Sequence, residues 1–256
     1  MNFPIGVIGG TGGMGKWMVR LLENEGFRVE TRGRNRGTDL AKMAAACPVI
    51  VVAVPMGDTV SVIGDVGPLM REDGLLMDLT SLKKAPVEAM LRSSPSEVIG
   101  CHPLFGPGVP SVRGENIVLC PARGDRWLPW VRDLFGKRGA RIVETTPEHH
   151  DRMMAVVQGM THLNTVLFGL YLRESGISRE DLRAFSTPVF RAKRALAEKI
   201  ASSPSLYSGI LSMNPHMGDV LKRCGKVLRD LEGLLERHDG NALADVLSKL
   251  GNDSGN

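Results

Sequence analysis

The chain has few cysteines, few aromatic residues and little net charge. Its 256 residues include four cysteines, aromatic residues make up 5%, and the formal net charge is +4. The cysteines are widely scattered, with no CxxC pair and no metal-ligand spacing, so the pattern excludes a disulfide framework and predicts no metal site. The small charge argues against nucleic acid or an anionic membrane as a partner. We expect a cytoplasmic protein with reduced thiols.

Long apolar runs are also missing. The longest, Cys47 to Met56, is about half as long as a segment that crosses a bilayer. The N-terminal residues carry no basic stretch of the kind that begins a signal peptide. We therefore expect no membrane anchor. The apolar content of 43% is that of an ordinary globular chain with a packed core.

The first 145 residues alternate short apolar segments with segments of helical periodicity. The run Val49 to Val54 is continuously apolar, which is typical of a strand buried on both faces. Strands separated by helices predict an α/β fold with a doubly wound parallel sheet. The predicted strands are 5–8, 27–31, 49–54, 75–79, 97–101, 116–120 and 140–144.

The pattern changes near residue 146, where Thr146 and Pro147 form a strong helix start. Helical periodicity continues from there to the end, which predicts an all-α C-terminal domain. We therefore divide the chain into domains 1–145 and 146–256, and expect a disordered tail at 252–256. The predicted helices are 147–175, which ends at Gly176, then 178–185, 187–201, 203–213, 216–237 and 241–249.

A glycine-rich motif follows the first strand and opens the first helix. In this context a GxGxxG motif predicts a dinucleotide-binding loop of a Rossmann-type domain. The first glycine allows a tight turn, the second lets the backbone approach the pyrophosphate, and the third lets helix and strand pack closely. The loop residues expected to bind the cofactor are Gly10, Thr11, Gly12, Met14 and Gly15.

The end of the second strand bears on the choice of cofactor. An NAD site usually carries an acidic residue there, but this chain has Arg32, Gly33 and Arg34, with Arg36 close behind. A glycine leaves room, and guanidinium groups pair well with a phosphate, so NADP is favoured over NAD. Two alternatives stay open: the arginines form a solvated basic loop, or Glu30 serves NAD if the strand register slips.

A histidine stands at the carboxyl end of a predicted strand, where open α/β sheets bind their ligands. His102 is followed by Pro103 and by a Gly-Pro turn, and its ordinary pKa of about 6.5 suits proton transfer. We therefore predict that His102 is a general base.

Four motifs occur in one order over some 200 residues and together resemble the prephenate dehydrogenase family. They are Asp78 to Lys83, His102 to Pro107, His150 to His162, and Ser186 to Arg191. The resemblance implies a stand-alone enzyme that oxidatively decarboxylates prephenate to 4-hydroxyphenylpyruvate in tyrosine biosynthesis, with hydride passing to NAD(P).

The resemblance also implies roles for individual residues. His102 accepts the proton of the ring hydroxyl, and Ser81 supports that geometry, although a serine there is equally a strand-end cap. Arg191 holds a substrate carboxylate. Gln158 and His162 lie on a polar helix face that lines the substrate cleft or, alternatively, packs against another helix.

Other side chains near these motifs receive simpler interpretations. We expect His149 and His150 to be capping and surface groups. An apolar helical stripe, including Met153 and Leu163, belongs either to the core or to the interface of a homodimer.

Three alternative functions remain. The first is arogenate dehydrogenase, which has the same chemistry and which an NADP preference keeps open. The second is another NADP-linked dehydrogenase, although residues 147–172 lack the lysine that hydroxyacid dehydrogenases place on this helix. The third is a non-catalytic NADP sensor, which would need no base at His102.

Overall fold

The computed structural model describes residues 3–34 and 37–251. Arg36 and the tail 252–256 lie outside the described residues. Contacts divide the chain into two compact units, one up to Asn214 and one from Pro215 onward. The first unit holds the sheet and the first helices of the C-terminal half. The division into domains at residue 146 stays a prediction.

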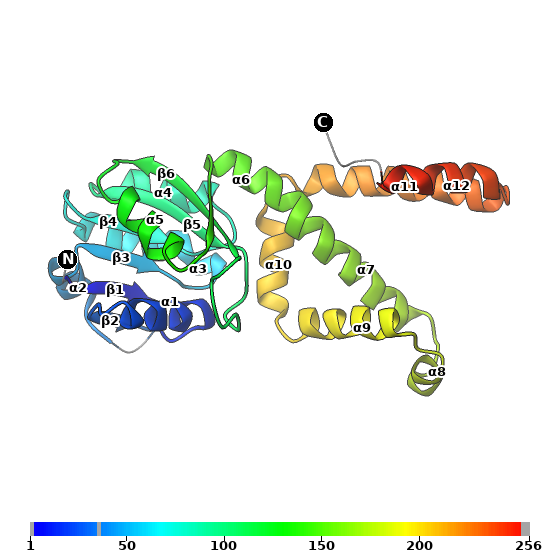
Figure 1. Ribbon diagram of the computed structural model, residues 1–256, viewed down its shortest axis with the longest axis horizontal. Coiled ribbons are helices and arrows are strands. Elements are labelled where there is room, and N and C mark those ends of the chain that lie inside the picture. Colours follow the sequence, from blue (N-terminus) through cyan, green and yellow to red (C-terminus); the bar gives the residue numbers. More distant parts are fainter. Residues whose placement is uncertain (1–2, 35–36, 252–256) are drawn as a thin grey trace. The chain divides into compact units, whose positions relative to one another are not determined.

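Seven strands of the described chain form one sheet in the order β2-β1-β3-β4-β5-β6-β7 (Figure 1). The strands are β1 (Ile5–Ile8), β2 (Val29–Arg32), β3 (Val49–Val52), β4 (Leu75–Asp78), β5 (Glu97–Pro103), β6 (Asn116–Arg123) and β7 (Arg141–Glu144). The first five are parallel, which confirms the doubly wound α/β fold. The end of β5 differs from the prediction, since the strand continues through His102 to Pro103.

Strands β6 and β7 run opposite to the other five, which the periodicity did not predict. β6 pairs antiparallel with β5, and β7 pairs parallel with β6. Residues 104–115, which join β5 to β6, contain no helix. A parallel connection needs a crossover that is usually helical, so this short return produces an antiparallel pair.

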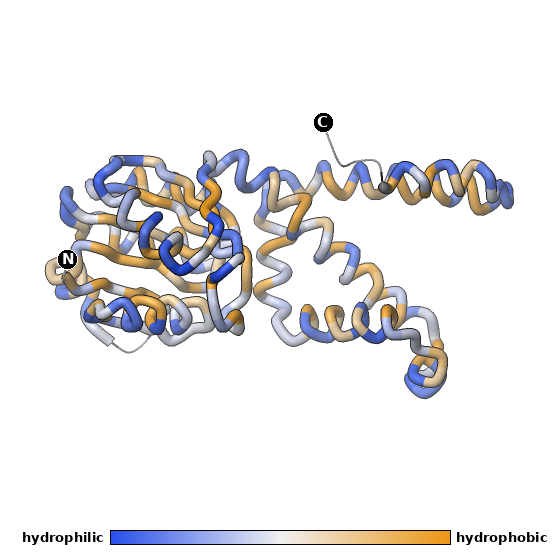
Figure 2. Tube along the Cα trace, in the orientation of Figure 1, coloured by the Kyte–Doolittle hydropathy of each residue, from blue (hydrophilic) through white to orange (hydrophobic). Residues whose placement is uncertain are grey.

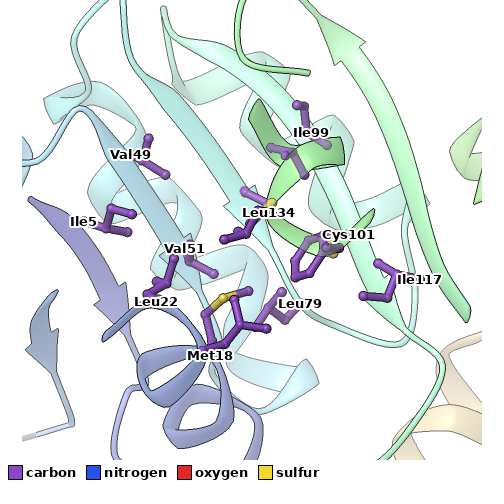
Figure 3. Close-up of a cluster of buried hydrophobic side chains, with 14 of the residues drawn as sticks. Ile5, Met18, Leu22, Val49, Val51, Leu79, Ile99, Cys101, Ile117 and Leu134 are labelled. Carbon is purple, nitrogen blue, oxygen red and sulfur yellow. The ribbon is translucent and has the colours of Figure 1, made fainter. Parts of the chain in front are cut away.

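Helices cover both faces of the sheet and enclose two hydrophobic layers. One layer packs α1 (Gly13–Asn24) and α5 (Leu128–Gly136) on the sheet, and Figure 3 shows its side chains, among them Met18, Val51 and Leu134. The other layer packs α2 (Leu40–Ala46), α3 (Met56–Val66) and α4 (Lys84–Ser93) on the opposite face. A single 3₁₀ turn, η1 (Gly67–Leu69), follows α3. Cys47 and Cys101 are buried free thiols in these layers, and Cys120 is a buried free thiol of β6, as expected of small apolar groups.

The helical half begins at the predicted cap. The Thr146 hydroxyl accepts a hydrogen bond from the His149 amide. The helical run that starts there ends shortly before Gly176, whose φ is +68°. The helical run comprises α6 (Pro147–Met154), the π-helical turn η2 (Ala155–Met160) and α7 (Thr161–Glu174). Three shorter helices complete this unit: α8 (Arg179–Ala184), α9 (Pro188–Ala201) and α10 (Pro204–Met213).

By length and composition alone, the run Pro147–Glu174 is the one described segment that could cross a membrane. Core helices of soluble proteins pass the same test. Its inward face carries the buried residues Ala155, Gly159 and Thr165, whereas Val156, Val157 and Leu167 are exposed. Figure 2 shows hydrophobic and hydrophilic residues alternating along it. The predicted apolar stripe is therefore largely on the surface of a single chain.

The second unit consists of α11 (Met217–Glu236), α12 (Gly240–Ser248) and the short turn η3 (Lys249–Gly251). Helices α11 and α12 contact each other. Leu221, Val227 and Leu228 of α11 are exposed. As in α7, apolar side chains on this helix lie at the surface of the single chain.

Candidate active site and nucleotide pocket

The glycine loop between β1 and α1 brings the backbone of the helix onto the strand. A Cβ at Gly15 would lie 2.0 Å from the carbonyl oxygen of Gly9, so no side chain fits there. Gly9 itself has a φ of +87°, which favours glycine. The first turn of α1 has neither a side-chain cap nor an acidic residue. Its amide groups therefore suit an anion.

A pocket of about 600 Å³ opens beside this loop. Five of the residues predicted to bind the cofactor line it: Thr11, Gly12, Arg32, Gly33 and Arg34. The other three do not. Gly10 lies against Thr31, Met14 packs against the core, and Gly15 provides the helix–strand contact. The motif therefore predicts both lining residues and the residues that shape the loop behind them.

The strand register places an arginine, and not an acid, at the pocket. Ile8 pairs with Arg32, the last residue of β2, whereas Glu30 pairs with Gly6 two residues earlier. Glu30 accepts a hydrogen bond from Arg28 at 3.3 Å and does not line the pocket. The register therefore does not bring Glu30 to the place where an NAD site has its acid.

The two pocket arginines are held differently. Nη1 of Arg32 donates to the backbone oxygen of Thr38 at 3.0 Å. Arg34 forms an exposed ion pair of 3.1 Å with Asp58, which also lines the pocket and which sequence reasoning missed. Glycine loop, helix N-terminus and arginines together fit a phosphorylated nucleotide.

A second cluster lies at the carboxyl end of β5, where His102 is 3% exposed. Nδ1 of His102 lies 2.9 Å from Nε2 of His150, and Nδ1 of His150 lies 2.7 Å from Oδ1 of Asp151. The carboxylate of Asp151 also accepts the backbone N–H groups of Lys83 at 2.7 Å and Lys84 at 3.0 Å. These contacts form an unbroken buried chain from the start of α4 to His102.

The direction of each hydrogen bond follows from the ionised carboxylate. Burial would raise the pKa of Asp151, but hydrogen bonds from His150 and from the two backbone amides lower it overall. An ionised carboxylate only accepts, so a neutral His150 donates its one ring proton from Nδ1 and presents a lone pair at Nε2. His102 must then donate from Nδ1, which leaves Nε2 unprotonated.

Burial also holds His102 in its neutral form. Desolvation lowers its pKa well below the ordinary value, and the positive charge of Lys83 lowers it further. The unprotonated Nε2 faces away from His150, since the hydrogen bond to His150 uses Nδ1. A neutral imidazole with one free basic nitrogen can accept a proton from a hydroxyl group.

A buried ion pair supports the strand that carries His102. Lys83 is fully buried and pairs with Asp78 at the end of β4. Nζ of Lys83 also donates to the carbonyl oxygen of Cys101 at 2.8 Å, and Thr80 donates its amide to Asp78 at 2.9 Å. Sequence reasoning gave Lys83 no role. In the structure it links Asp78 at the end of β4 to Cys101 of β5, the residue before His102.

Gln158 is brought to the free side of His102 by the π-helical turn η2. Its Nε2 lies 3.4 Å from Nε2 of His102, and its Oε1 is buried without a hydrogen-bond partner among the described residues. Such turns are frequent at functional sites. His162 lies further along the same helix and stacks edge-on against Tyr207, with 4.9 Å between ring centroids. Burial, with a smaller effect of Lys199, lowers the pKa of His162.

Like His162, two more of the predicted residues have no hydrogen bond or ring contact with His102 in the described chain. The half-buried Ser81 has no hydrogen bond to His102 in the described chain. Arg191 is exposed at the start of α9 and donates to the carbonyl oxygen of Ser186 at 2.9 Å.

The expectation that His150 is a capping or surface group is wrong. Its side chain is 2% exposed and forms the middle of the chain between His102 and Asp151. Its neighbour His149 is exposed and contacts Arg152. Helical spacing could not separate these two, because the partner of His150 is 48 residues away in the sequence. The signal was only its place beside an aspartate in one of the four motifs.

Comparison with known proteins identifies the family. The profile described as "Prephenate dehydrogenase, nucleotide-binding domain" matches residues 23–144, and "Prephenate dehydrogenase, dimerization domain" matches residues 146–249. A probable arogenate/prephenate dehydrogenase of Methanocaldococcus jannaschii is 31% identical over 268 residues, covering 97% of this chain and 60% of that protein. The T-protein of Enterobacter agglomerans is 30% identical over 248 residues, covering 96% and 66% of the two chains.

A solved structure shares the fold. The crystal structure of prephenate dehydrogenase from A. aeolicus, in complex with hydroxyphenyl propionate and NAD+, superposes with a TM-score of 0.79 at 18% identity. It covers 98% of this chain and 96% of that chain. The chain thus spans less than two thirds of the length of the two curated relatives, and the two family profiles match residues 23–144 and 146–249 of it. The chain belongs to the prephenate dehydrogenase family.

Proposed function

We propose that the chain catalyses the NAD(P)-dependent oxidative decarboxylation of prephenate to 4-hydroxyphenylpyruvate, a step of tyrosine biosynthesis. The observation that carries this proposal is the buried His102, which is hydrogen-bonded through His150 to Asp151. The family assignment and the nucleotide pocket beside the glycine loop support it. The reaction needs both a base and a hydride acceptor, and these features supply the base and a place for the acceptor.

His102 assists the step in which hydride leaves the carbinol carbon of the substrate. The bound nicotinamide cofactor supplies the hydride acceptor. Nε2 of His102 accepts the hydroxyl proton as the carbon becomes carbonyl-like, and this relieves the developing positive charge. When the carboxylate leaves as carbon dioxide, its bonding electrons enter the ring, and His102 returns the proton to the phenolic oxygen.

Asp151 and His150 prepare His102 for this role. They hold the imidazole in the tautomer that accepts at Nε2, as the orienting carboxylate does in a catalytic triad. When His102 is protonated, the lone pair of His150 and the negative charge of Asp151 beyond it stabilise the imidazolium.

We assign Gln158, His162 and Arg191 to the substrate side, and keep Ser81 as a residue that supports the hydroxyl geometry. Gln158 has a buried Oε1 beside His102 that finds no partner within residues 3–34 and 37–251, which supports a polar ligand at this place. Arg191 is exposed, so its guanidinium is available for a carboxylate, to which it can bind through two parallel hydrogen bonds.

NADP is the cofactor that we propose, with NAD as the alternative. Arg32 ends β2 beside the pocket, Gly33 adds no side chain, and Glu30 is turned to Arg28. A second negative group on the ribose would find Arg32 and Arg34 within the same pocket.

We also propose a homodimer in the cytoplasm. The exposed apolar side chains Val156, Val157, Leu167 and Tyr171 along η2 and α7 would be buried against a second copy. The second family profile is described as a dimerization domain, which supports this arrangement. Light scattering tests it, and a monomer at micromolar concentration would reject it. The three buried free thiols support a reducing compartment.

One steady-state experiment tests the function. The purified chain is assayed with prephenate and with arogenate, each with NADP and with NAD, and the four kcat/KM values are compared. We expect the highest value for prephenate with NADP. A higher value for arogenate would select arogenate dehydrogenase, the alternative with the same chemistry, and activity with neither substrate would reject the proposal.

A further inference from the structure

A separate pocket of about 580 Å³ lies between α1 and the segment 107–113. Three arginines line it: Arg20 on α1, Arg113 before β6, and Arg138 after α5. It shares no lining residue with the nucleotide pocket, and none of its residues belongs to the His102 cluster. We call it the arginine pocket.

The charges of the arginine pocket are incompletely balanced. Nη2 of Arg138 pairs with Glu25, but Nη1 of Arg138 is buried and has no hydrogen-bond partner among the described residues. Neither Arg20 nor Arg113 forms an ion pair within residues 3–34 and 37–251. A buried donor without a partner is costly, and an excess of positive charge along one pocket is also unfavourable. Both costs would be relieved by a bound anion.

Arg113 is supported from beneath by a glycine. Gly139 has a φ of +84°, and a Cβ there would come within 3.2 Å of Cγ of Arg113. The amide of Gly114 also donates to the carbonyl oxygen of Gly139 at 2.8 Å. The aliphatic part of Arg113 therefore rests on a glycine backbone that is itself hydrogen-bonded, which limits where its guanidinium can lie.

The remaining lining suits a small organic molecule better than a bare ion. Pro107, Val109 and Pro110 contribute apolar surface, and the volume lies in the range of ligand pockets. A concave site with a few charged groups and apolar walls selects a compact ligand, whereas an extended polyanion needs an open basic surface.

We propose that the arginine pocket binds a small organic anion that carries at least two negative charges on a compact apolar body. Two carboxylates, or one phosphate and one carboxylate, would bridge the guanidinium groups of Arg20, Arg113 and Arg138. This site is independent of the proposed dehydrogenase reaction, because it uses neither the nucleotide pocket nor His102.

Calorimetric titration of the full chain with phthalate, citrate and inorganic phosphate tests the proposal, both without nucleotide and with saturating NADP. We expect phthalate or citrate to bind with a dissociation constant of about 1 mM or tighter, more tightly than phosphate, and equally well with NADP present. The double variant Arg20→Gln/Arg113→Gln should weaken this binding at least about tenfold, since charge-assisted hydrogen bonds are lost.

Arg92→Gln is the matched control, because Arg92 is exposed on α4 and lies outside the pocket. It makes the same change of charge and should leave the titration unchanged. Equal binding by the double variant, displacement by NADP, or no binding of any probe to the wild-type chain would overturn the proposal. If the wild-type chain has no dehydrogenase activity or does not bind NADP, the proposed function fails, but the titration with phthalate still tests the arginine pocket.

Discussion

The C-terminal ends of β5 and β2 lie on the same side of the parallel strands but are built differently. At the end of β5, His102 is buried, and the residues that determine its tautomer, His150 and Asp151, are buried with it. At the end of β2, Arg32 and Arg34 line an open pocket, and Arg34 is held by one exposed ion pair. The first site is thus built from buried contacts within the chain, whereas the second is open to solvent.

This difference separates the expected effects of mutation. A change within the buried chain removes an interaction that matters in the transition state, so it should lower kcat. A change among the exposed arginines removes binding to a ligand group that does not react, so it should raise KM or the dissociation constant. The predictions below test this division, beginning with the largest expected effect.

His102→Asn should lower kcat by about 10²- to 10⁴-fold, because it removes the proposed general base. The dissociation constant for NADP, measured by fluorescence titration, should stay within about twofold of the wild-type value, because the nucleotide pocket contains no part of His102. His149→Asn is the matched control, since His149 is exposed and lies outside the buried chain. Full activity of His102→Asn would remove the basis of the proposed function.

His150→Phe should lower kcat by about 10²-fold with little change in KM, because it removes the acceptor that sets the tautomer of His102. His150→Gln, whose side-chain oxygen can accept the same hydrogen bond, should recover part of the loss. A structural role alone would not distinguish these two variants. Because the residues act as one unit, the double variant His102→Asn/His150→Phe should be no slower than His102→Asn. Additive losses would show that His150 acts separately.

Arg191→Ala should raise KM for prephenate about 10- to 100-fold and leave the NADP dissociation constant unchanged, since a charge-assisted pair is worth about 1.5–3 kcal/mol. Arg194→Ala is the control on the same helix, because Arg194 already pairs with Glu198. An unchanged KM in Arg191→Ala would place the substrate carboxylate elsewhere.

The sites at the ends of β2 and β5 were also unequally predictable from sequence. The nucleotide loop is local: six consecutive residues set its turn, and the strand before it and the helix after it follow from their periodicity. Thr11, Gly12 and Arg32 accordingly line the pocket where expected. The chain that prepares His102 is assembled from distant segments, and neither the 48 residues between His102 and His150 nor the link from Asp151 to the amide of Lys83 leaves a periodic signal.

The reversal of β6 and β7 was missed for a related reason. Strand periodicity is the same in either direction, and only the absence of a helix in 104–115 indicates that the chain turns back. The π-helical turn that carries Gln158 was missed because one wide turn inside a helix changes the apolar pattern very little.

Arg32→Ser should lower kcat/KM with NADP about tenfold and leave kcat/KM with NAD nearly unchanged, since only NADP has the additional phosphate. Arg34→Ser should cost only about threefold, because Arg34 is exposed and must leave Asp58 to reach the ligand. Asp58→Asn should then strengthen NADP binding slightly. Equal losses with both cofactors in Arg32→Ser would favour a general role of the arginine in the loop over the choice of cofactor.

The pH dependence of stability provides the smallest test. The pKa of His102 is lowered by burial, so between its folded pKa and its ordinary pKa of about 6.5 the unfolded chain binds a proton that the folded chain does not. The stability is therefore fully present above pH 6.5 and falls as the pH is lowered, by at most about 1.4 kcal/mol per pH unit for this one group. Urea unfolding at pH 7 and 5.5 should show that His102→Asn loses about 1 kcal/mol less than the wild type over this range. An equal loss in both proteins would mean that the pKa of the buried His102 is not lowered by folding. The C-terminal ends of β5 and β2 would then differ in exposure but not in how burial affects their charged groups.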